Sequence, residues 1–307
     1  MRLPRIVAPV DAPTISGNDQ PSRLHWRASP DDGNPAMTRF DYRDKTALIT
    51  GASSGIGEAF AHQLAARGMH LILVARSQDK LLSLADALGR EHGCRTKVLV
   101  ADLSDPDQAS GLADRVKSAG LQADLIINNA GFGTHGRFTR QSAAQERREV
   151  LLNALAPLEI AHAFVPSMVE RGGGAIINVA SSAGFQATPY MSTYGATKAF
   201  LLHLSEGLWA ELEPDNIQVM AVCPGPVATN FFEASGSPTL KKALSTTPMI
   251  SAERCVRESL EAFDKGRPVV VPGLSIKLMT QSGRFMPRAL LTKISARMLG
   301  PKKRKTG

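Results

Sequence analysis

Cysteine is scarce in this chain of 307 residues, which contains Cys94, Cys223 and Cys255 and no others. An odd number of cysteines without a metal-ligand or redox spacing provides neither a disulfide framework nor a cysteine-based metal site. We therefore interpret all three as packing residues in a reducing compartment, and we expect no metal site.

Long apolar runs are also missing from the sequence. No stretch approaches the roughly 18–20 apolar residues that span a bilayer. The N-terminal region lacks the apolar segment of a signal peptide. These absences favour a cytoplasmic protein.

Acidic residues are absent from Lys265 to the end of the chain, a stretch that contains 11 Lys and Arg. This stretch accounts for the net charge of +8, and residues 1–264 carry a small negative charge. A basic tail on a nearly neutral body is weak support for a nucleic-acid-binding fold. We expect no nucleic-acid partner.

The chain divides into three parts by pattern. Residues 1–36 contain six prolines and no period of 2 or 3.6, so we predict a disordered N-terminal extension. Residues 37–273 alternate β-rich runs with amphipathic helices. This alternation predicts a doubly wound α/β (Rossmann) fold, in which helices cover both faces of a mostly seven-stranded parallel sheet. Residues 274–307 form a basic, partly helical tail.

The expected secondary structure follows from the same pattern. Strands are predicted near 45–50, 70–75, 96–101, 124–128, 174–180, 217–222 and 268–271. Helices are predicted near 55–67, 78–91, 106–118, 141–170, 192–213 and 251–264. Residues 226–250, rich in Ser, Thr and Pro, are predicted to form a mobile loop.

A glycine-rich turn joins the first predicted strand to the first helix. Glycine is needed where a chain turns tightly and where backbone approaches a pyrophosphate, whose charge the N–H groups of the helix N-terminus receive. A glycine-rich turn alone is weak evidence, but its place between a strand and a helix favours a nucleotide site. The candidate cofactor-binding residues of this turn are Gly51, Ser53, Ser54, Gly55, Ile56 and Gly57.

The end of the second strand indicates which cofactor binds. An NAD-binding fold usually places an acid there for the ribose 2′-OH, whereas this chain has Ala75 and Arg76. A guanidinium beside the ribose suits a 2′-phosphate, so NADP(H) is favoured over the alternative of a solvated arginine. Asp102 and Leu103 follow the third strand and are placed to border the adenine, although an Asp there is also an ordinary helix cap.

Tyr194 and Lys198 form the candidate proton-transfer pair. They are four residues apart, so on a helix they share a face and the ammonium can lie near the phenol. An unperturbed tyrosine titrates near ~10. A neighbouring cation favours the phenolate and moves the pKa of the tyrosine toward a range useful for proton transfer.

Taken together, these motifs resemble the short-chain dehydrogenase/reductase family over residues 43–272. The set includes Thr50 to Gly57, Asn128 to Gly131, Asn153, Ser181, Tyr194-Gly195-Ala196-Thr197-Lys198 and Pro224 to Thr229. The resemblance implies that Tyr194 is the general acid/base and that Lys198 binds the nicotinamide ribose and lowers the tyrosine pKa. It implies that Ser181 hydrogen-bonds the substrate carbonyl and that Asn153 holds a water of a proton relay. The residues implied to flank the nicotinamide are Asn129, Ala130, Gly131, Pro224, Gly225, Val227 and Thr229.

The resemblance also implies the reaction, which is the interconversion of a carbonyl and an alcohol with NADP(H). Family members begin a few residues before their first strand, so Met37 is the expected start and residues 1–36 are unexplained. We expect a homo-oligomer.

The tail offers a second interaction. Leu290, Ile294 and Met298 form one helical stripe with bases nearby, so the tail is a candidate for peripheral contact with anionic lipid at the inner membrane face. The competing interpretations are a helix that caps the substrate cleft and a dimer contact.

The substrate is not revealed by any motif. Apolar residues of the 226–250 loop suggest an apolar carbonyl substrate, although core packing explains them equally well; they are Phe231, Phe232, Leu240, Leu244, Pro248 and Met249. Three alternatives remain open: a non-catalytic dinucleotide sensor, a membrane- or nucleic-acid-docking protein, and an extended family member acting on nucleotide sugars. The joint presence of the four catalytic residue types argues against the sensor.

Overall fold

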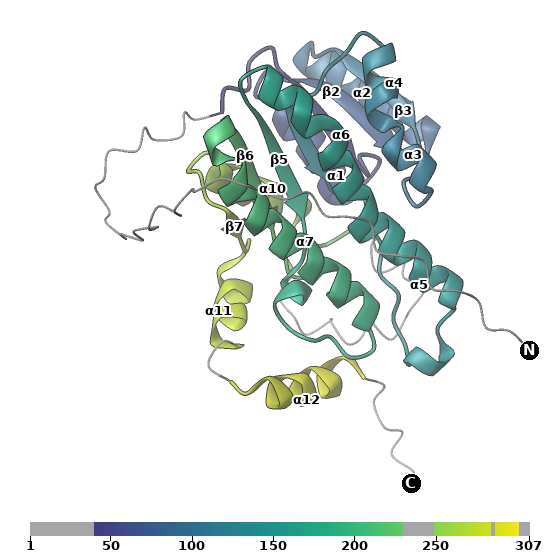
Figure 1. The fold of residues 1–307 in the computed structure, drawn as a ribbon, viewed down its shortest axis with the longest axis vertical. Helices are drawn as coiled ribbons and strands as arrows, with labels where there is room; N and C mark the ends of the chain where they lie inside the picture. Colours follow the sequence, from purple (N-terminus) through teal and green to yellow (C-terminus); the bar gives the residue numbers. More distant parts are fainter. Residues whose placement is uncertain (1–39, 230–248, 284–285, 301–307) are drawn as a thin grey trace, which may run out of the picture. The chain divides into compact units, whose positions relative to one another are not determined.

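Apolar runs of four to six residues form most of a seven-stranded parallel sheet with the strand order β3-β2-β1-β4-β5-β6-β7 (Figure 1). The strands are β1 (Thr46–Thr50), β2 (His70–Ala75), β3 (Thr96–Val100), β4 (Leu125–Asn128), β5 (Gly174–Val179), β6 (Ile217–Val222) and β7 (Val269–Val270). Every strand bound lies within one residue of its predicted position. The doubly wound fold predicted from the sequence is confirmed.

The structure is a computed structural model that describes residues 40–229, 249–283 and 286–300. The predicted N-terminal extension, most of the predicted loop at 226–250 and the end of the basic tail lie outside the described residues. Of the apolar residues assigned to that loop, only Met249 is described, and it is 40% exposed.

Helices cover both faces of the sheet because successive strand residues point to opposite sides. Ile49, Ile127 and Ile177 belong to one core cluster, and their neighbours Leu48, Ile126 and Ile176 belong to the other. The first cluster includes residues of α1 (Gly55–Ala65), α2 (Gln78–His92) and α10 (Ala252–Phe263). The second includes residues of α3 (Pro106–Ser110), α4 (Leu112–Ser118) and α6 (Ala156–Glu170), and α7 (Ser192–Glu211) packs beside them.

Two predicted helices are interrupted. The helix expected at 106–118 breaks at Gly111 into α3 and α4. The helix expected at 141–170 consists of α5 (Ala143–Val150), a π-helical turn (Leu151–Leu155) and α6. Pro157 has no N–H, so it cannot donate the α-helical hydrogen bond to the Asn153 carbonyl, and the wide turn falls at this place.

The continuous helical segment 143–170 is long and apolar enough to cross a bilayer. The sequence reading that no stretch approaches this criterion was therefore wrong. The apolar side of the segment packs on the sheet, where Ile160, Phe164 and Met168 are buried. Core helices commonly meet the same criterion, and we assign this segment to the core.

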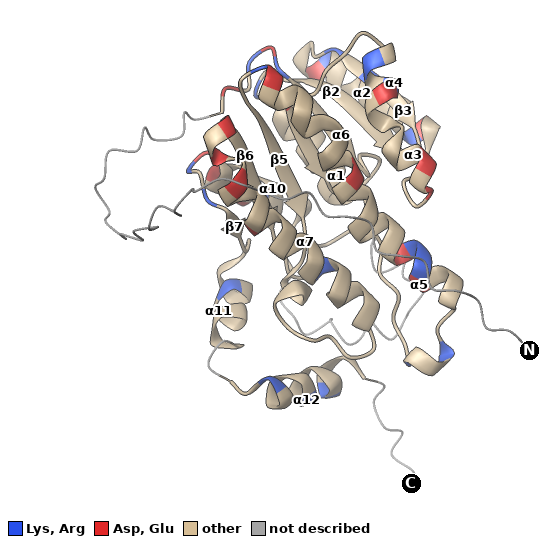
Figure 2. Ribbon diagram, in the orientation of Figure 1, with Lys and Arg blue, Asp and Glu red and all other residues tan. Residues whose placement is uncertain are grey.

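The basic tail contains two helices, α11 (Leu274–Ser282) and α12 (Arg288–Leu299). Figure 2 shows that both carry bases and no acidic residue. The predicted stripe of α12 is exposed, at 49% for Leu290, 37% for Ile294 and 53% for Met298. Both helices belong to the same compact unit as the sheet.

The order of the strands reverses between β1 and β4, and a single hydroxyl joins the two strands there. Thr50 Oγ1 donates to the Ile127 carbonyl at 3.2 Å and accepts from the N–H groups of Asn129 and Ala130 at 2.9 and 3.0 Å. The Asn129 side chain donates to the Thr50 and Gly51 carbonyls at 2.9 and 3.2 Å. In open α/β sheets, ligands bind outside the carboxyl ends of the strands at such a reversal.

Gly57 lets α1 begin directly against this junction. A Cβ at position 57 would stand 2.3 Å from the Gly51 carbonyl oxygen and 2.5 Å from Asn129 Nδ2, which are both held by the contacts above. Any side chain at this position would force the glycine-rich turn away from β4.

We expect Gly57→Ala to lower the free energy of unfolding by about 1–3 kcal/mol, because the added methyl overpacks a backbone contact. The matched control is Gly207→Ala in α7, where a Cβ would meet nothing within 4 Å. That change should stabilise the protein by about 0.5–1 kcal/mol. Urea unfolding of both variants measures the difference, and equal effects would contradict the packing role of Gly57.

Candidate active site

The glycine-rich turn forms a cradle of bare backbone at the carboxyl end of β1. Ser54 precedes α1 in an extended conformation and makes no side-chain cap, so the first N–H groups of the helix have no side-chain acceptor there. A Cβ at Gly55 would stand 2.9 Å from Thr229 Cγ2, which places the predicted segment 224–229 over the turn. Ser53 is half-buried, and Ile56 packs on the core. This cradle, which a side chain would fill, fits the pyrophosphate of a dinucleotide.

The predicted adenosine end lies beyond β2 and β3. Arg76 is exposed at the end of β2. Asp102 accepts from the N–H and hydroxyl of Ser104, and its carboxylate lies 3.1 Å from the Arg148 guanidinium. Burial raises the pKa of Asp102, but Ser104, Arg148 and Arg76 outweigh it and hold that pKa below its usual range. Leu103 follows Asp102 and is buried in the core.

The predicted catalytic side chains converge beside the cradle. Tyr194 and Lys198 lie on one face of α7, and Lys198 Nζ stands 5.9 Å from the centre of the Tyr194 ring. Lys198 Nζ donates to the Val179 carbonyl at the end of β5, at 2.7 Å. Ser181 hydrogen-bonds Tyr194, and its Oγ also accepts from the Ala183 N–H at 3.1 Å.

The electrostatics of this pair differ from the sequence-based expectation. Burial raises the pKa of Tyr194 to about 12, since it outweighs the hydrogen bond with Ser181, and the negative charge of Glu149 raises it further. Burial also lowers the pKa of Lys198 to about 8, against an opposing effect of Cys223 and Glu149. The predicted lowering of the tyrosine pKa by Lys198 is therefore not achieved by the polypeptide's own groups.

Asn153 lies in the π-helical turn and is fully buried. Its side chain accepts from the Phe132 N–H at 3.1 Å and donates to the Phe132 carbonyl at 2.8 Å. A Cβ at Gly131 would stand 2.9 Å from Asn153 Oδ1 and 3.5 Å from Lys198 Nζ. A glycine at position 131 thus leaves space beside both side chains.

The predicted segment 224–229 closes the site from β6. The Pro224 carbonyl accepts from the Ser182 N–H at 2.8 Å, and Gly225 packs against Ile276 of α11. Val227 is buried and pairs with Ile250 in an isolated parallel bridge.

Sequence reasoning missed two groups of polar contacts. Asn128 donates to Asn178, which donates to Ser205 of α7, both at 2.9 Å, and this buried chain fixes α7 on the sheet. Glu149 and Thr134 form the second group, at the end of α5. Glu149 could have been found from the sequence, because it lies one helical turn before the predicted site residue Asn153 and therefore on the same face of the helix.

The C-terminal helices pack on the loops around the predicted catalytic residues. Gln186 donates to the buried Ser295 of α12 at 3.2 Å. The His135 ring lies 2.9 Å from the Leu299 carbonyl, and Gly300 packs against the Tyr190 ring. In the described part of the chain, α11 and α12 thus form walls beside the site.

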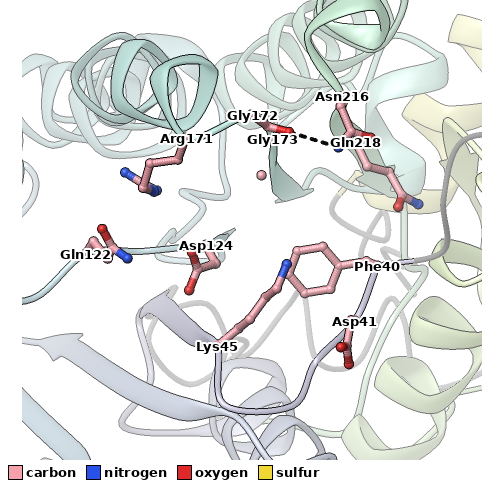
Figure 3. Close-up of a pocket in the computed structure, with 11 residues that line it drawn as sticks. Phe40, Asp41, Lys45, Gln122, Asp124, Arg171, Gly172, Gly173, Asn216 and Gln218 are labelled. Atoms are coloured by element: carbon pink, nitrogen blue, oxygen red, sulfur yellow. Dashed lines mark hydrogen bonds between the residues drawn. The ribbon is translucent and has the colours of Figure 1, made fainter.

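A cavity of about 450 Å³ lies at the opposite edge of the sheet, where the strands begin (Figure 3). Lys45, Asp124 and Asn216 immediately precede β1, β4 and β6 on its lining. Its polar groups join strand starts: Asp124 accepts from the Thr46 N–H at 2.9 Å, and Asn216 donates to the Gly172 carbonyl at 3.0 Å. None of the predicted site residues lines it, and we assign it no catalytic role.

Comparisons with known proteins agree with the geometry of the site at the carboxyl edge. The family model for short chain dehydrogenase matches residues 45–239. A very-long-chain 3-oxoacyl-CoA reductase-B of Danio rerio is 30% identical over 276 residues, which cover 88% of this chain and 81% of that protein. A very-long-chain 3-oxoacyl-CoA reductase of Anas platyrhynchos is 33% identical, and the match covers 62% of each chain.

Two solved structures are also similar. A short-chain dehydrogenase from Sphingobium yanoikuyae in complex with NADPH has a TM-score of 0.70 and 36% identity, over 81% of this chain and 95% of that one. A bulky-bulky ketone specific alcohol dehydrogenase from Comamonas testosteroni has a TM-score of 0.67 and 33% identity, over 86% of this chain and 96% of that one.

We expect Arg76→Leu to weaken NADPH binding by about ten- to a hundredfold, because hydrogen bonds to charged groups contribute about 1.5–3 kcal/mol. NADH affinity should not change. Fluorescence titration of both cofactors measures this, with Arg90→Leu on the exposed face of α2 as the control for a lost positive charge. Equal weakening of NADH and NADPH by Arg76→Leu would show that Arg76 does not bind the 2′-phosphate.

Proposed function

The chain belongs to the short-chain dehydrogenase/reductase family and is an NADP(H)-dependent oxidoreductase of carbonyl and alcohol groups, and from this we propose that it acts as a reductase on an apolar ketone. The convergence of Ser181, Tyr194, Lys198 and Asn153 at the carboxyl edge of the sheet carries the proposal. A non-catalytic sensor would have no need of these four side chains beside one another.

In the proposed mechanism, Ser181 and Tyr194 bind the substrate carbonyl oxygen together. The two hydroxyls lie close enough to hydrogen-bond each other, so a carbonyl oxygen that replaces this bond can accept from both. Tyr194 is the proton donor at its phenolic oxygen. Its raised pKa keeps the phenol protonated at neutral pH, which suits the reductive direction.

Lys198 has a supporting role in this mechanism. Its hydrogen bond to the Val179 carbonyl fixes the ammonium below the Tyr194 ring, where a positive charge stabilises the phenolate that remains after proton donation. The cradle from Gly51 to Gly57 would hold the pyrophosphate of NADPH, and Arg76 its 2′-phosphate. When bound, NADPH supplies the hydride.

The preference for an apolar substrate has two supports. The relatives named above act, by their names, on very-long-chain 3-oxoacyl-CoA, and one solved structure is that of an enzyme specific for bulky ketones. In this chain, the α11 wall contributes Ile276 against Gly225 beside Ser181 and carries exposed Leu274, Leu278 and Met279.

We expect Tyr194→Phe to lower kcat for NADPH-dependent ketone reduction by about 10²–10⁴-fold, the usual contribution of a positioned proton donor. NADPH affinity should stay within a fewfold of wild type, because little volume is removed. Tyr190→Phe, four residues earlier, removes the same hydroxyl from another tyrosine and is the control. Turnover of Tyr194→Phe within tenfold of wild type, measured by loss of NADPH absorbance, would refute the mechanism.

We further propose that α11 and α12 make a peripheral contact with an anionic lipid surface, at the cytoplasmic face of a membrane. Three exposed apolar residues line α12, with Arg288, Lys293 and Arg297 on the same helix and no acid on either helix. Apolar burial combined with attraction to anionic headgroups is the usual basis of such binding.

Sedimentation with phosphatidylserine vesicles tests this contact. The full chain should sediment at low salt and be released at high salt, because screening weakens the attraction. Leu290→Gln combined with Met298→Gln should abolish sedimentation, whereas Leu82→Gln on the exposed face of α2 should not. An absence of sedimentation, or a full chain that instead forms dimers lost in the double variant, would overturn the lipid proposal and favour a second copy as the partner.

A further inference from the structure

Glu149 is a fully buried carboxylate next to the predicted catalytic residues. Glutamate is almost never fully buried unless it is paired. It lies at the end of α5, four residues before Asn153, on the helix that runs along the site. The proposed mechanism does not use it.

One oxygen of Glu149 has a structural role. Oε2 accepts from the N–H of Thr134 at 3.1 Å and from its hydroxyl at 2.7 Å. Asn153 holds Phe132 in the same loop by two hydrogen bonds. Successive turns of one helical segment therefore fix the loop that follows β4.

The other oxygen has no such role. Glu149 Oε1 is buried and has no hydrogen-bond partner among the described residues. A glutamine would satisfy Thr134 equally well, since its amide oxygen can accept both hydrogen bonds. A second reason is needed for a carboxylate at this position.

The charges around Glu149 provide that reason. Lys198 Nζ lies close to Asn153, one helical turn after Glu149, because a Cβ at Gly131 would stand 2.9 Å from Asn153 Oδ1 and 3.5 Å from Lys198 Nζ. The other ionisable groups that act on this set are Tyr194 on α7, Glu146 one turn earlier on α5, and Cys223 after β6. Burial raises the pKa of Glu149, and the Lys198 cation opposes this. Lys198 is the positive group in this set, and burial would otherwise disfavour its charge.

We propose that Glu149 is the buried counter-charge of Lys198, and so a positioning residue that sets the alkaline limit of the reaction. The inference rests on the proposed function of Lys198. A negative charge at Glu149 extends the pH range in which Lys198 keeps its proton. Loss of that charge lowers the pKa of both Lys198 and Tyr194, and reduction requires both groups protonated, so the two effects act in the same direction.

The test is the pH profile of kcat/KM for NADPH-dependent ketone reduction by the full chain. Glu149→Gln should move the alkaline limb to lower pH by about one unit, as expected for the loss of a nearby opposite charge. Glu146→Gln is the matched control, because Glu146 is a half-buried carboxylate that accepts from Thr193 at 2.9 Å. An alkaline limb of Glu149→Gln that coincides with that of wild type would overturn the proposal.

Thr134→Val distinguishes the charge of Glu149 from its structural role in holding the loop after β4. It also provides a test if Glu149→Gln does not fold. The substitution removes the hydroxyl hydrogen bond and keeps the carboxylate, so it should lower stability and leave the alkaline limb in place. A limb shifted to lower pH in Thr134→Val would overturn the proposal in favour of a purely structural role.

The pH dependence of the NADPH dissociation constant is a second readout that needs no turnover. If Lys198 binds the ribose, NADPH affinity should decrease as the pH rises and Lys198 loses its proton. In Glu149→Gln this decrease should begin at a lower pH than in wild type. Failure of the Tyr194 mechanism alone would leave this binding shift intact, whereas failure of the counter-charge would remove it.

Discussion

The site depends on the hydrogen bonds that the Thr50 hydroxyl makes with the end of β4. This hydroxyl contacts three main-chain groups of the β4 end, and it does so at the reversal of strand order, where the helices that follow β1 and β4 lie on opposite faces of the sheet. The glycine-rich turn and the segment 129–131 are thereby held together. Gly131 in turn leaves room for Asn153 and Lys198, so the Thr50 hydroxyl holds in place the segment beside which both side chains lie.

Much of this arrangement was predictable because the signals are local. Alternation of apolar runs with amphipathic helices defined each strand to within one residue, and family spacing selected Tyr194, Lys198, Ser181 and Asn153. The interruptions were harder to predict. Gly111 and Pro157 are visible in the sequence, but whether a helix breaks, kinks or widens depends on packing that the residues alone do not determine.

Buried polar contacts were the least predictable. Asn128, Asn178 and Ser205 form a chain across β4, β5 and α7, and the partners are 50 and 27 residues apart. A glutamate that follows two arginines in a helix is typical of an exposed helix face. Only the tertiary structure shows that Glu149 is buried. The pKa of Tyr194 was likewise misjudged from spacing, since the distance to Lys198 says nothing about the desolvation of both groups.

Different parts of the chain form the cofactor-binding and substrate-facing sides of the site. The dinucleotide cradle comes from the first strands and helices, whereas the walls beside Ser181 come from the last helices, α11 and α12. Among the described residues, the contacts of these helices include Ile276 against Gly225, the Gln186 side chain with Ser295, and the Leu299 carbonyl beside His135. Because the cradle and these walls come from different elements, residues of α11 and α12 that face the substrate can change without altering the redox chemistry of the site.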